Sequence, residues 1–214
     1  VTNLDVGREK SINALEVATA EDKLIILVTQ KDPEITDITV EDMYPFGVLA
    51  QVRQQTRLPN GALRVLVEGL ERVQLTLVSD NAQPKSYFIG QGIVVAETAV
   101  TDTETEALRR LLLEATEQWL VENKKVNPDV LETLREQQDV SKMTDAMVGF
   151  LSLPMADKEA LLEMINPKER MRTLYELICR EIEISSLAKS ITKQVQVQVE
   201  QNQREYYLRE QMKA

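Results

Sequence analysis

Residues 58–72 of this 214-residue chain read LPNGALRVLVEGLER, and this stretch decides the fold of the first half. Asn60-Gly61 is the strongest short signal for a β-hairpin, because a type I′ turn needs positive φ at both central residues. Apolar and other side chains then alternate along residues 62–78, as in a strand with one buried face. Gly69 interrupts that strand, which predicts a β-bulge.

The residues on both sides of the hairpin predict a small β-rich domain. The expected elements are a helix within residues 5–21, strands at 23–29, 47–56, 62–78 and about 87–97, and a loop at 31–44. The strand at 23–29 holds five consecutive apolar residues, a pattern typical of a buried strand. Several strands with tight turns and one crossing helix favour a curled, barrel-like sheet.

The second half of the chain reads as helical. The helix-start signals are Thr103-x-x-Glu106, Asn127-Pro128, Asp139, Pro154 and Asn166-Pro167-x-Glu169. We therefore predict an α+β chain in three parts: a β-rich domain at 1–98, an α-helical bundle at 101–165 and a long helix at 166–214.

The last helix is expected to be unusually long. No Gly or Pro follows from Lys168 to Ala214, which predicts about 49 helical residues, or roughly 73 Å at ~1.5 Å per residue. Residues 200–205 are all polar, so this part bridges domains or forms a spacer rather than packing in a core. Because no Gly or Asn closes the helix at Ala214, we expect more chain to follow.

Composition excludes several classes of function. The net charge of −10 argues against nucleic acid as a partner, because such a surface needs clustered Lys and Arg. No apolar run is long enough for a membrane span, and no signal peptide is visible. The single Cys179 cannot form an internal disulfide, which favours a reducing cytoplasm. Cys179 is either a small residue packed at a helix contact or a thiol activated by the neighbouring Arg180.

The chain also lacks the usual residues of catalysis. It has no His, so Ser-His and Cys-His nucleophiles and His-ligated zinc sites are absent from the sequence. It has neither a phosphate-binding G-x-x-x-x-G-K-[ST] loop nor a G-x-G-x-x-G motif. We expect no catalytic, cofactor or metal site in these residues.

An apolar cluster near the end of the long helix is the candidate polypeptide contact. It consists of Tyr206, Tyr207, Leu208 and Met212. Tyr offers a rigid amphipathic ring and Met adapts to varied partners, which suits the binding of extended or unfolded polypeptide. The alternative is that the cluster docks on a following domain.

Three motifs resemble the Lon protease family. Residues 203–214, QREYYLREQMKA, are similar to the segment that leads into the ATPase module of Lon proteases. Residues 58–72 resemble the family's hairpin signature, and residues 6–11, VGREKS, resemble the start of its first helix. These motifs lie near the beginning, at one third and at the end, so the resemblance covers the whole chain.

The resemblance implies a PUA-like β subdomain, a helical bundle and a long helix leading to an AAA+ module. It implies a parent that is a homohexameric, ATP-dependent serine protease of the cytoplasm. In that family this region selects unfolded or damaged proteins and takes part in assembly. ATP, Mg and the Ser-Lys dyad belong to the downstream modules, so no cofactor is expected here.

One departure from the family and three hypotheses of function remain. Family members begin with a Pro- and Leu-rich strand that precedes the position of Val1, and its absence would leave a sheet edge open to pairing or swapping.

The region is a substrate-recognition module, an assembly and spacer element, or a stand-alone binding protein without a protease. The uncapped final helix argues against the third.

Overall fold

The computed structural model describes the chain except residues 82–84, 98–99, 123–126, 128 and 214. The side chains of Tyr207, residues 209–211 and Lys213 also lie outside the described part. The chain forms two compact units, and each combines two segments of the sequence. The sheet unit contains Val1–Thr98 and Pro154–Ile165, and the helical unit contains Ala99–Leu153 and Asn166–Ala214.

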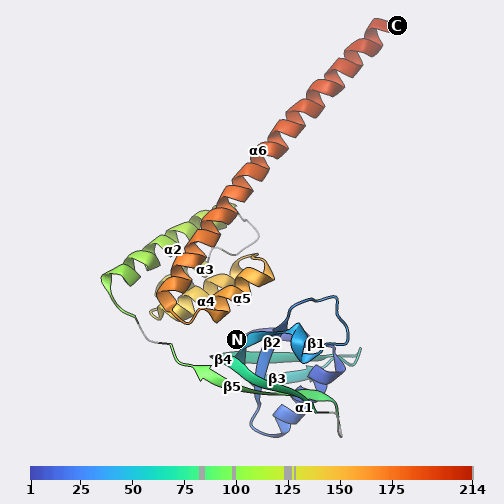
Figure 1. The fold of residues 1–214 in the computed structure, drawn as a ribbon. Helices are drawn as coiled ribbons and strands as arrows, with labels where there is room; N and C mark the ends of the chain where they lie inside the picture. The colour runs from blue at the N-terminus through green and yellow to red at the C-terminus, as the bar shows by residue number, and fades with distance from the viewer. Residues whose placement is uncertain (82–84, 98–99, 123–126, 128, 214) are drawn as a thin grey trace. The chain divides into compact units, whose positions relative to one another are not determined.

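The sheet unit is built on five antiparallel strands (Figure 1). Its elements are β1 (Thr2–Val6), α1 (Glu9–Ala20), β2 (Leu24–Gln30), a 3-10 turn (Val40–Asp42), β3 (Met43–Arg57), β4 (Leu63–Asn81), β5 (Tyr87–Val95) and α5 (Met155–Glu163). The strand order is β1-β4-β3-β2, and β5 pairs with the second half of the long β4. The pairing confirms the small β-rich sheet expected from the sequence, but the expected barrel-like form is wrong, because the sheet is open and β1 and β2 each pair with a single described strand.

Helix α1 covers one face of the sheet and makes its core. Leu15 is 2% exposed and packs against a cluster of small and branched side chains. These are Ala50 and Val52 of β3 and Leu63, Val65 and Val67 of β4. The burial of alternate residues of β4 confirms the period of two, and each fully buried aliphatic side chain contributes about 1.5–3 kcal/mol.

The predicted β3–β4 hairpin is confirmed, but the predicted type I′ turn is wrong. The Gly61 amide donates to the Leu58 carbonyl oxygen at 3.0 Å, which puts Pro59 and Asn60 at the centre of the turn. The proline ring holds φ near about −65°, so a type I′ turn cannot form there. Gly61, the residue after Pro59 and Asn60, has a positive φ of 85°, as is common for the residue that follows the turn in a longer hairpin loop.

The bulge predicted at Gly69 is present. Leu49 pairs with Glu71 while Ala50 pairs with Gly69, so Leu70 is the extra residue of β4. Strand β1, in contrast, was not predicted from the sequence. It lies on the first half of β4, with Leu4 facing Val65, and is only five residues long.

The helical unit contains α2 (Thr103–Glu122), α3 (Val130–Glu136), α4 (Val140–Phe150) and α6 (Pro167–Lys213). The first half of α6 supplies the centre of its core. Its fully buried residues Met171, Leu174 and Ile178 share this unit's core with Leu112 of α2 and Met143 of α4. Helix α6 has 47 residues, about 70 Å, and its second half extends past α2 with no neighbour in Figure 1.

The helix-start predictions were partly right. Asp139 accepts hydrogen bonds from the Ser141 and Lys142 amides, as expected of a cap. Asn166 accepts from the Lys168 amide at 3.0 Å and begins α6 as predicted. The prediction of Asn127 as a helix cap is wrong, because α3 begins at Val130 with Asp129 at the cap position, and the Asn127 side chain accepts from the Asp129 amide instead; Pro128 lies outside the described residues.

The predicted capping box at Thr103 and Glu106 is wrong. Asp102 caps α2 instead, since its Oδ1 accepts from the Thr105 amide at 2.9 Å. The Lys168 ammonium also binds Asp102. Hydrogen bonds from Lys168 and then Thr105 lower the pKa of Asp102 to about 2. A carboxylate at this helix end is favoured by both the orphan amides and the helix dipole.

Helix α5 belongs to the sheet unit, although the expected bundle at 101–165 included it. It packs against β3, and the Arg72 guanidinium donates to the Leu162 carbonyl oxygen at 3.1 Å. Glu159 is 4% exposed and bonds to Thr29 of β2, and burial raises the pKa of its carboxyl group. Residues 166–214 share the helical unit with 99–153 rather than forming a separate part.

Candidate functional site

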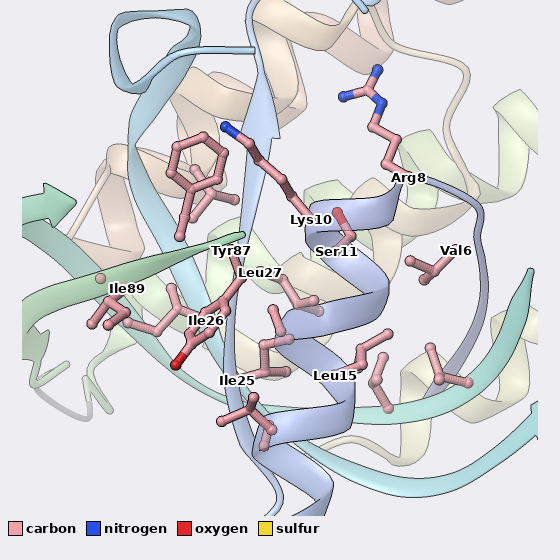
Figure 2. A pocket seen from close by; sticks show the side chains of 18 of the residues that line it. Val6, Arg8, Lys10, Ser11, Leu15, Ile25, Ile26, Leu27, Tyr87 and Ile89 are labelled. Carbon is pink, nitrogen blue, oxygen red and sulfur yellow. The ribbon is translucent and has the colours of Figure 1, made fainter. Parts of the chain in front are cut away.

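The main candidate site is an apolar pocket of about 850 Å³ in the sheet unit, between α1, β2 and β5 (Figure 2). One wall is α1, whose Lys10, Ser11 and Leu15 are drawn in the figure. The other walls are β2, with Ile25, Ile26 and Leu27, and the first half of β5, with Tyr87 and Ile89. A hollow of this size, lined mainly by apolar side chains, fits several residues of a polypeptide.

Strand β2 is exposed to this pocket more than its sequence suggests. All seven residues of Leu24–Gln30 are half-buried and none is fully buried. Each fully buried aliphatic side chain contributes about 1.5–3 kcal/mol, so part of this stabilisation is unrealised in β2. The pocket therefore offers apolar surface to a partner.

The pocket is tight on the β5 side. A Cβ atom added to Gly90 of β5 would lie 3.5 Å from the Ile26 Cδ1 atom of β2. Lys10 of α1 binds Asp80 of β4 at 2.6 Å and lies over the Phe88 ring, with its Nζ 4.4 Å from the ring centroid. These contacts of Lys10 hold α1 against β4 and β5.

Charged groups lie at opposite ends of β2. Arg8 lines the pocket beside the last residue of β2, and its guanidinium donates to the Gln30 side chain. Glu21 and Asp22 also line the pocket and precede the first residue of β2. The pocket lining is thus basic where β2 ends and acidic shortly before β2 begins, with the basic Lys23 between Asp22 and Leu24.

Two carboxylates beside the pocket are held ionised by cations. Arg64 binds Asp5 through two hydrogen bonds of 2.7 and 2.8 Å and lowers the pKa of Asp5. Hydrogen bonding and attraction by Lys85, with a smaller effect of Arg57, lower the pKa of Glu16. Both carboxyl groups therefore stay ionised near neutral pH.

Among the residues that the structure describes, no group of three or more metal-ligating side chains is found. No helix within that same part is long and apolar enough to span a membrane. Cys179 is half-buried on α6, and its hydrogen bond to Tyr175 raises the pKa of that tyrosine.

The candidate residues from the sequence lie on α6, in the helical unit. Tyr206 is 64% exposed, Leu208 54% and Met212 88%, so all three are available to a partner. The side chain of Tyr207 lies outside the described residues. Whether this cluster contacts polypeptide stays a prediction.

Sequence reasoning did not single out the residues of the pocket. Its signal was the run Leu24–Val28, which predicted a strand but not that its side chains remain half-exposed. The pocket residues of β5, which are Tyr87, Phe88, Ile89 and Gly90, had no distinguishing pattern. Their place in the pocket follows from how β5 returns beside α1, a contact between distant parts of the sequence.

Comparison with known proteins gives a consistent result. A family model described as the substrate-binding domain of the ATP-dependent protease La (LON) matches residues 1–180. The Lon protease of Brevibacillus choshinensis is 40% identical over 214 residues, which is all of this chain and 27% of that protein. The Lon protease of Escherichia coli strain K12 is 37% identical, again with 27% of its length covered. The chain therefore spans about a quarter of these relatives.

Solved structures show the same fold at low sequence identity. The N-terminal domain of Mycobacterium avium complex Lon protease has a TM-score of 0.67 and 20% identity, covering 83% of this chain and 89% of that one. The Lon N-terminal domain protein of Xanthomonas campestris has a TM-score of 0.56 and 11% identity, covering 81% and 86%. At such identities the likeness concerns the fold alone.

Proposed function

The chain belongs to the family of Lon substrate-binding domains, and on that premise we propose that it selects unfolded or damaged proteins for an ATP-dependent protease. Recognition rests on apolar segments that native proteins bury and unfolded proteins expose. The chain itself binds and positions polypeptide, while peptide-bond hydrolysis takes place elsewhere in the parent protein.

The observation that carries this proposal is the apolar pocket of about 850 Å³ beside the half-buried strand β2. Its lining supplies apolar area without a specific polar code, which suits clients of varied sequence. A single such contact is weak, and several copies in one assembly strengthen it through effective concentration.

The parent protein is proposed to be a cytoplasmic homohexamer with an AAA+ module that binds ATP and Mg and a serine endopeptidase module. Its clients are proposed to be misfolded, damaged and short-lived regulatory proteins. These properties extend the family membership of the 214 residues to a protein about four times as long.

A matched pair of variants tests recognition by the pocket. Ile89 lines the pocket and is 44% exposed, whereas Ile93 lies on the same strand, is 61% exposed and does not line it. Ile89→Glu should weaken binding of a fluorescent, permanently unfolded client at least tenfold, and Ile93→Glu should leave it nearly unchanged. Both positions are exposed, so both variants should fold.

The readout is fluorescence anisotropy with the unfolded client, and the folded protein from which that client is derived serves as the native control. Equal binding of the unfolded and native forms would contradict the proposed function. Equal binding of the unfolded client by both variants would contradict the pocket as its site. The double variant Tyr206→Ala/Leu208→Ala tests the α6 cluster in the same assay.

A second function, assembly, is favoured by an exposed apolar stripe along α6. Ile184, Leu187, Ile191, Val195 and Val199 are 47–62% exposed along it. Most of these residues recur at intervals of three or four, as in helices that pair with other helices. We propose that copies of the chain associate through this stripe.

Charge placed in the stripe tests assembly. Val195→Glu with Val199→Glu should dissociate the oligomers of the full-length protein, measured by sedimentation velocity. Gln194→Glu with Gln198→Glu adds the same charge one position away on the helix and should preserve them. Equal oligomers for both pairs would exclude the stripe as the contact.

A further inference from the structure

The turn between β3 and β4 carries a reactive pair of residues at its tip. Asn60 is the one asparagine of the sequence that is followed by glycine. Because glycine has no Cβ atom, its backbone nitrogen can approach the preceding side chain without steric hindrance. Asn60 and Gly61 are both exposed, and nothing lies within 4 Å of the place that a Cβ atom of Gly61 would take. Solvent therefore reaches both residues.

The side chain of Asn60 is bonded to the backbone that follows it. Its Oδ1 atom accepts a hydrogen bond from the Ala62 amide at 3.2 Å. This is an Asx turn, in which a short side chain takes the place of a backbone carbonyl group. The bond polarises the side-chain carbonyl, and the ring of atoms that it closes includes the Gly61 nitrogen. The turn thus holds an electrophilic carbon, Cγ of Asn60, close in the chain to a backbone nitrogen.

The chemistry that these two groups allow is intramolecular. The Gly61 nitrogen attacks the Asn60 Cγ atom, the N–Cγ bond forms, and the Cγ–Nδ2 bond breaks. The amide proton of Gly61 leaves with Nδ2 as ammonia, and a succinimide ring remains. Water then opens the ring at either carbonyl group, which gives aspartate or isoaspartate. No group is oxidised or reduced, so water is the only other reactant.

Hydrogen bonds of the folded turn hold this reaction back. The Gly61 amide donates to the Leu58 carbonyl oxygen at 3.0 Å, and the Leu58 amide donates to the Ala62 carbonyl oxygen at 2.8 Å. The turn must open before the Gly61 nitrogen is released from its acceptor and can reach Cγ. Pro59 makes such opening rarer, because its ring fixes one dihedral angle of the turn. Local opening of the hairpin tip therefore sets the rate.

We propose that Asn60 is a modification site, which converts itself to aspartate or isoaspartate when the β3–β4 turn opens. The reaction needs neither an enzyme nor a cofactor, and it is separate from the recognition of client proteins. Aspartate adds a negative charge and keeps the ordinary backbone. Isoaspartate inserts a methylene group into the main chain just before β4, whose first residue, Leu63, is 3% exposed in the core of the sheet unit. The isoaspartate form should therefore loosen this end of the hairpin.

Peptide mapping by mass spectrometry on the intact chain, kept at pH 7.5 and 37 °C, tests the site. The comparison is the blocked peptide Arg-Leu-Pro-Asn-Gly-Ala-Leu, which has the sequence of residues 57–63. Asn60 should react faster than every other asparagine of the chain. It should react roughly tenfold or more slowly than the peptide, because hydrogen bonds of the turn must break first. Faster conversion of another asparagine, or an Asn60 unchanged over a hundred half-lives of the peptide, overturns the proposal.

Two variants separate opening of the turn from the chemistry. Asn60→Gln should nearly abolish conversion at this position, because the longer side chain does not close the same ring. Pro59→Ala should speed conversion of the folded chain about two- to fivefold, since the turn opens more often. In concentrated urea, Pro59→Ala and wild type should react at the same rate. Equal rates of the two folded chains, or of the folded chain and the peptide, overturn control by the turn.

The isoaspartate form tests the structural consequence. It is separated from the aspartate form by chromatography and compared with the variant Asn60→Asp, which has the same charge and an ordinary backbone. Hydrogen exchange measured by NMR should be at least tenfold faster for the Leu58 amide in the isoaspartate form, because that amide donates across the turn. Equal exchange in the two proteins would overturn the loosening of the hairpin.

Discussion

Replacement of Gly47 by alanine should loosen β2 from β3. A Cβ atom at Gly47 would lie 2.7 Å from the Leu27 carbonyl oxygen and 3.1 Å from the Cγ2 atoms of Ile26 and Val28. The first neighbour is backbone within the β2–β3 ladder and cannot move away without breaking the pairing. Overpacking of this kind costs about 1–3 kcal/mol.

Gly90→Ala is the matched control. Its Cβ atom would meet Ile26 Cδ1 and Leu75 Cδ2 at 3.5 Å, which is ordinary contact. Replacing a glycine in such a position stabilises a protein by about 0.4–1 kcal/mol, because the unfolded chain loses freedom. The two alanine variants should therefore differ by about 1.4–4 kcal/mol in the stability of the sheet unit.

Hydrogen exchange with mass spectrometry measures this difference locally. A loss of about 2 kcal/mol speeds exchange of the β2 and β3 amides roughly 30-fold. The single tryptophan, Trp119, lies in α2 of the helical unit, so its fluorescence serves as an internal control and should not change. Equal protection of β2 in the Gly47→Ala and Gly90→Ala variants would refute the packing argument.

Three further predictions concern stability. Leu174→Ala removes a fully buried side chain of α6 and should cost about 2–5 kcal/mol, seen as an earlier denaturant midpoint of Trp119 fluorescence. Asp102 has a folded pKa of about 2 against an ordinary 3.8, so its stabilisation is present above about pH 4 and lost toward pH 2. Wild type should exceed Asp102→Asn in stability at pH 6, with the gap closing over that window. Burial raises the pKa of Glu159, so the free energy of unfolding falls as pH rises above 4.5, the ordinary pKa of the group. The Glu159→Gln variant should therefore be more stable than wild type at pH 8, and this advantage should shrink toward pH 4.5.

Much of the fold follows from short-range signals. The hairpin around Gly61, the bulge at Gly69 and the caps at Asp139 and Asn166 depend on a few adjacent residues, and each was predicted. The turn type was missed because Pro59, not Asn60, occupies the first central position. Strand β1 was missed because it has only five residues, of which two, Leu4 and Val6, are apolar, and pairing with β4 decides its conformation.

The site was harder to predict than the fold. The run Leu24–Val28 reads as a buried strand, because sequence alone does not show that the neighbouring edge is unpaired. Its exposure depends on which strands meet, a property of long-range topology. The α6 cluster at Tyr206 was conspicuous because apolar residues reappear after a polar stretch, and its partner depends on residues outside the 214.

The discontinuity of the sheet unit affects the order in which the protein can fold during synthesis. Helix α5 leaves the ribosome after roughly 55 further residues of the helical unit have been made. At ~5–20 residues per second the five strands wait about 3–11 s for it. During that interval the surface of β3 that α5 covers is open to other nascent chains and to chaperones.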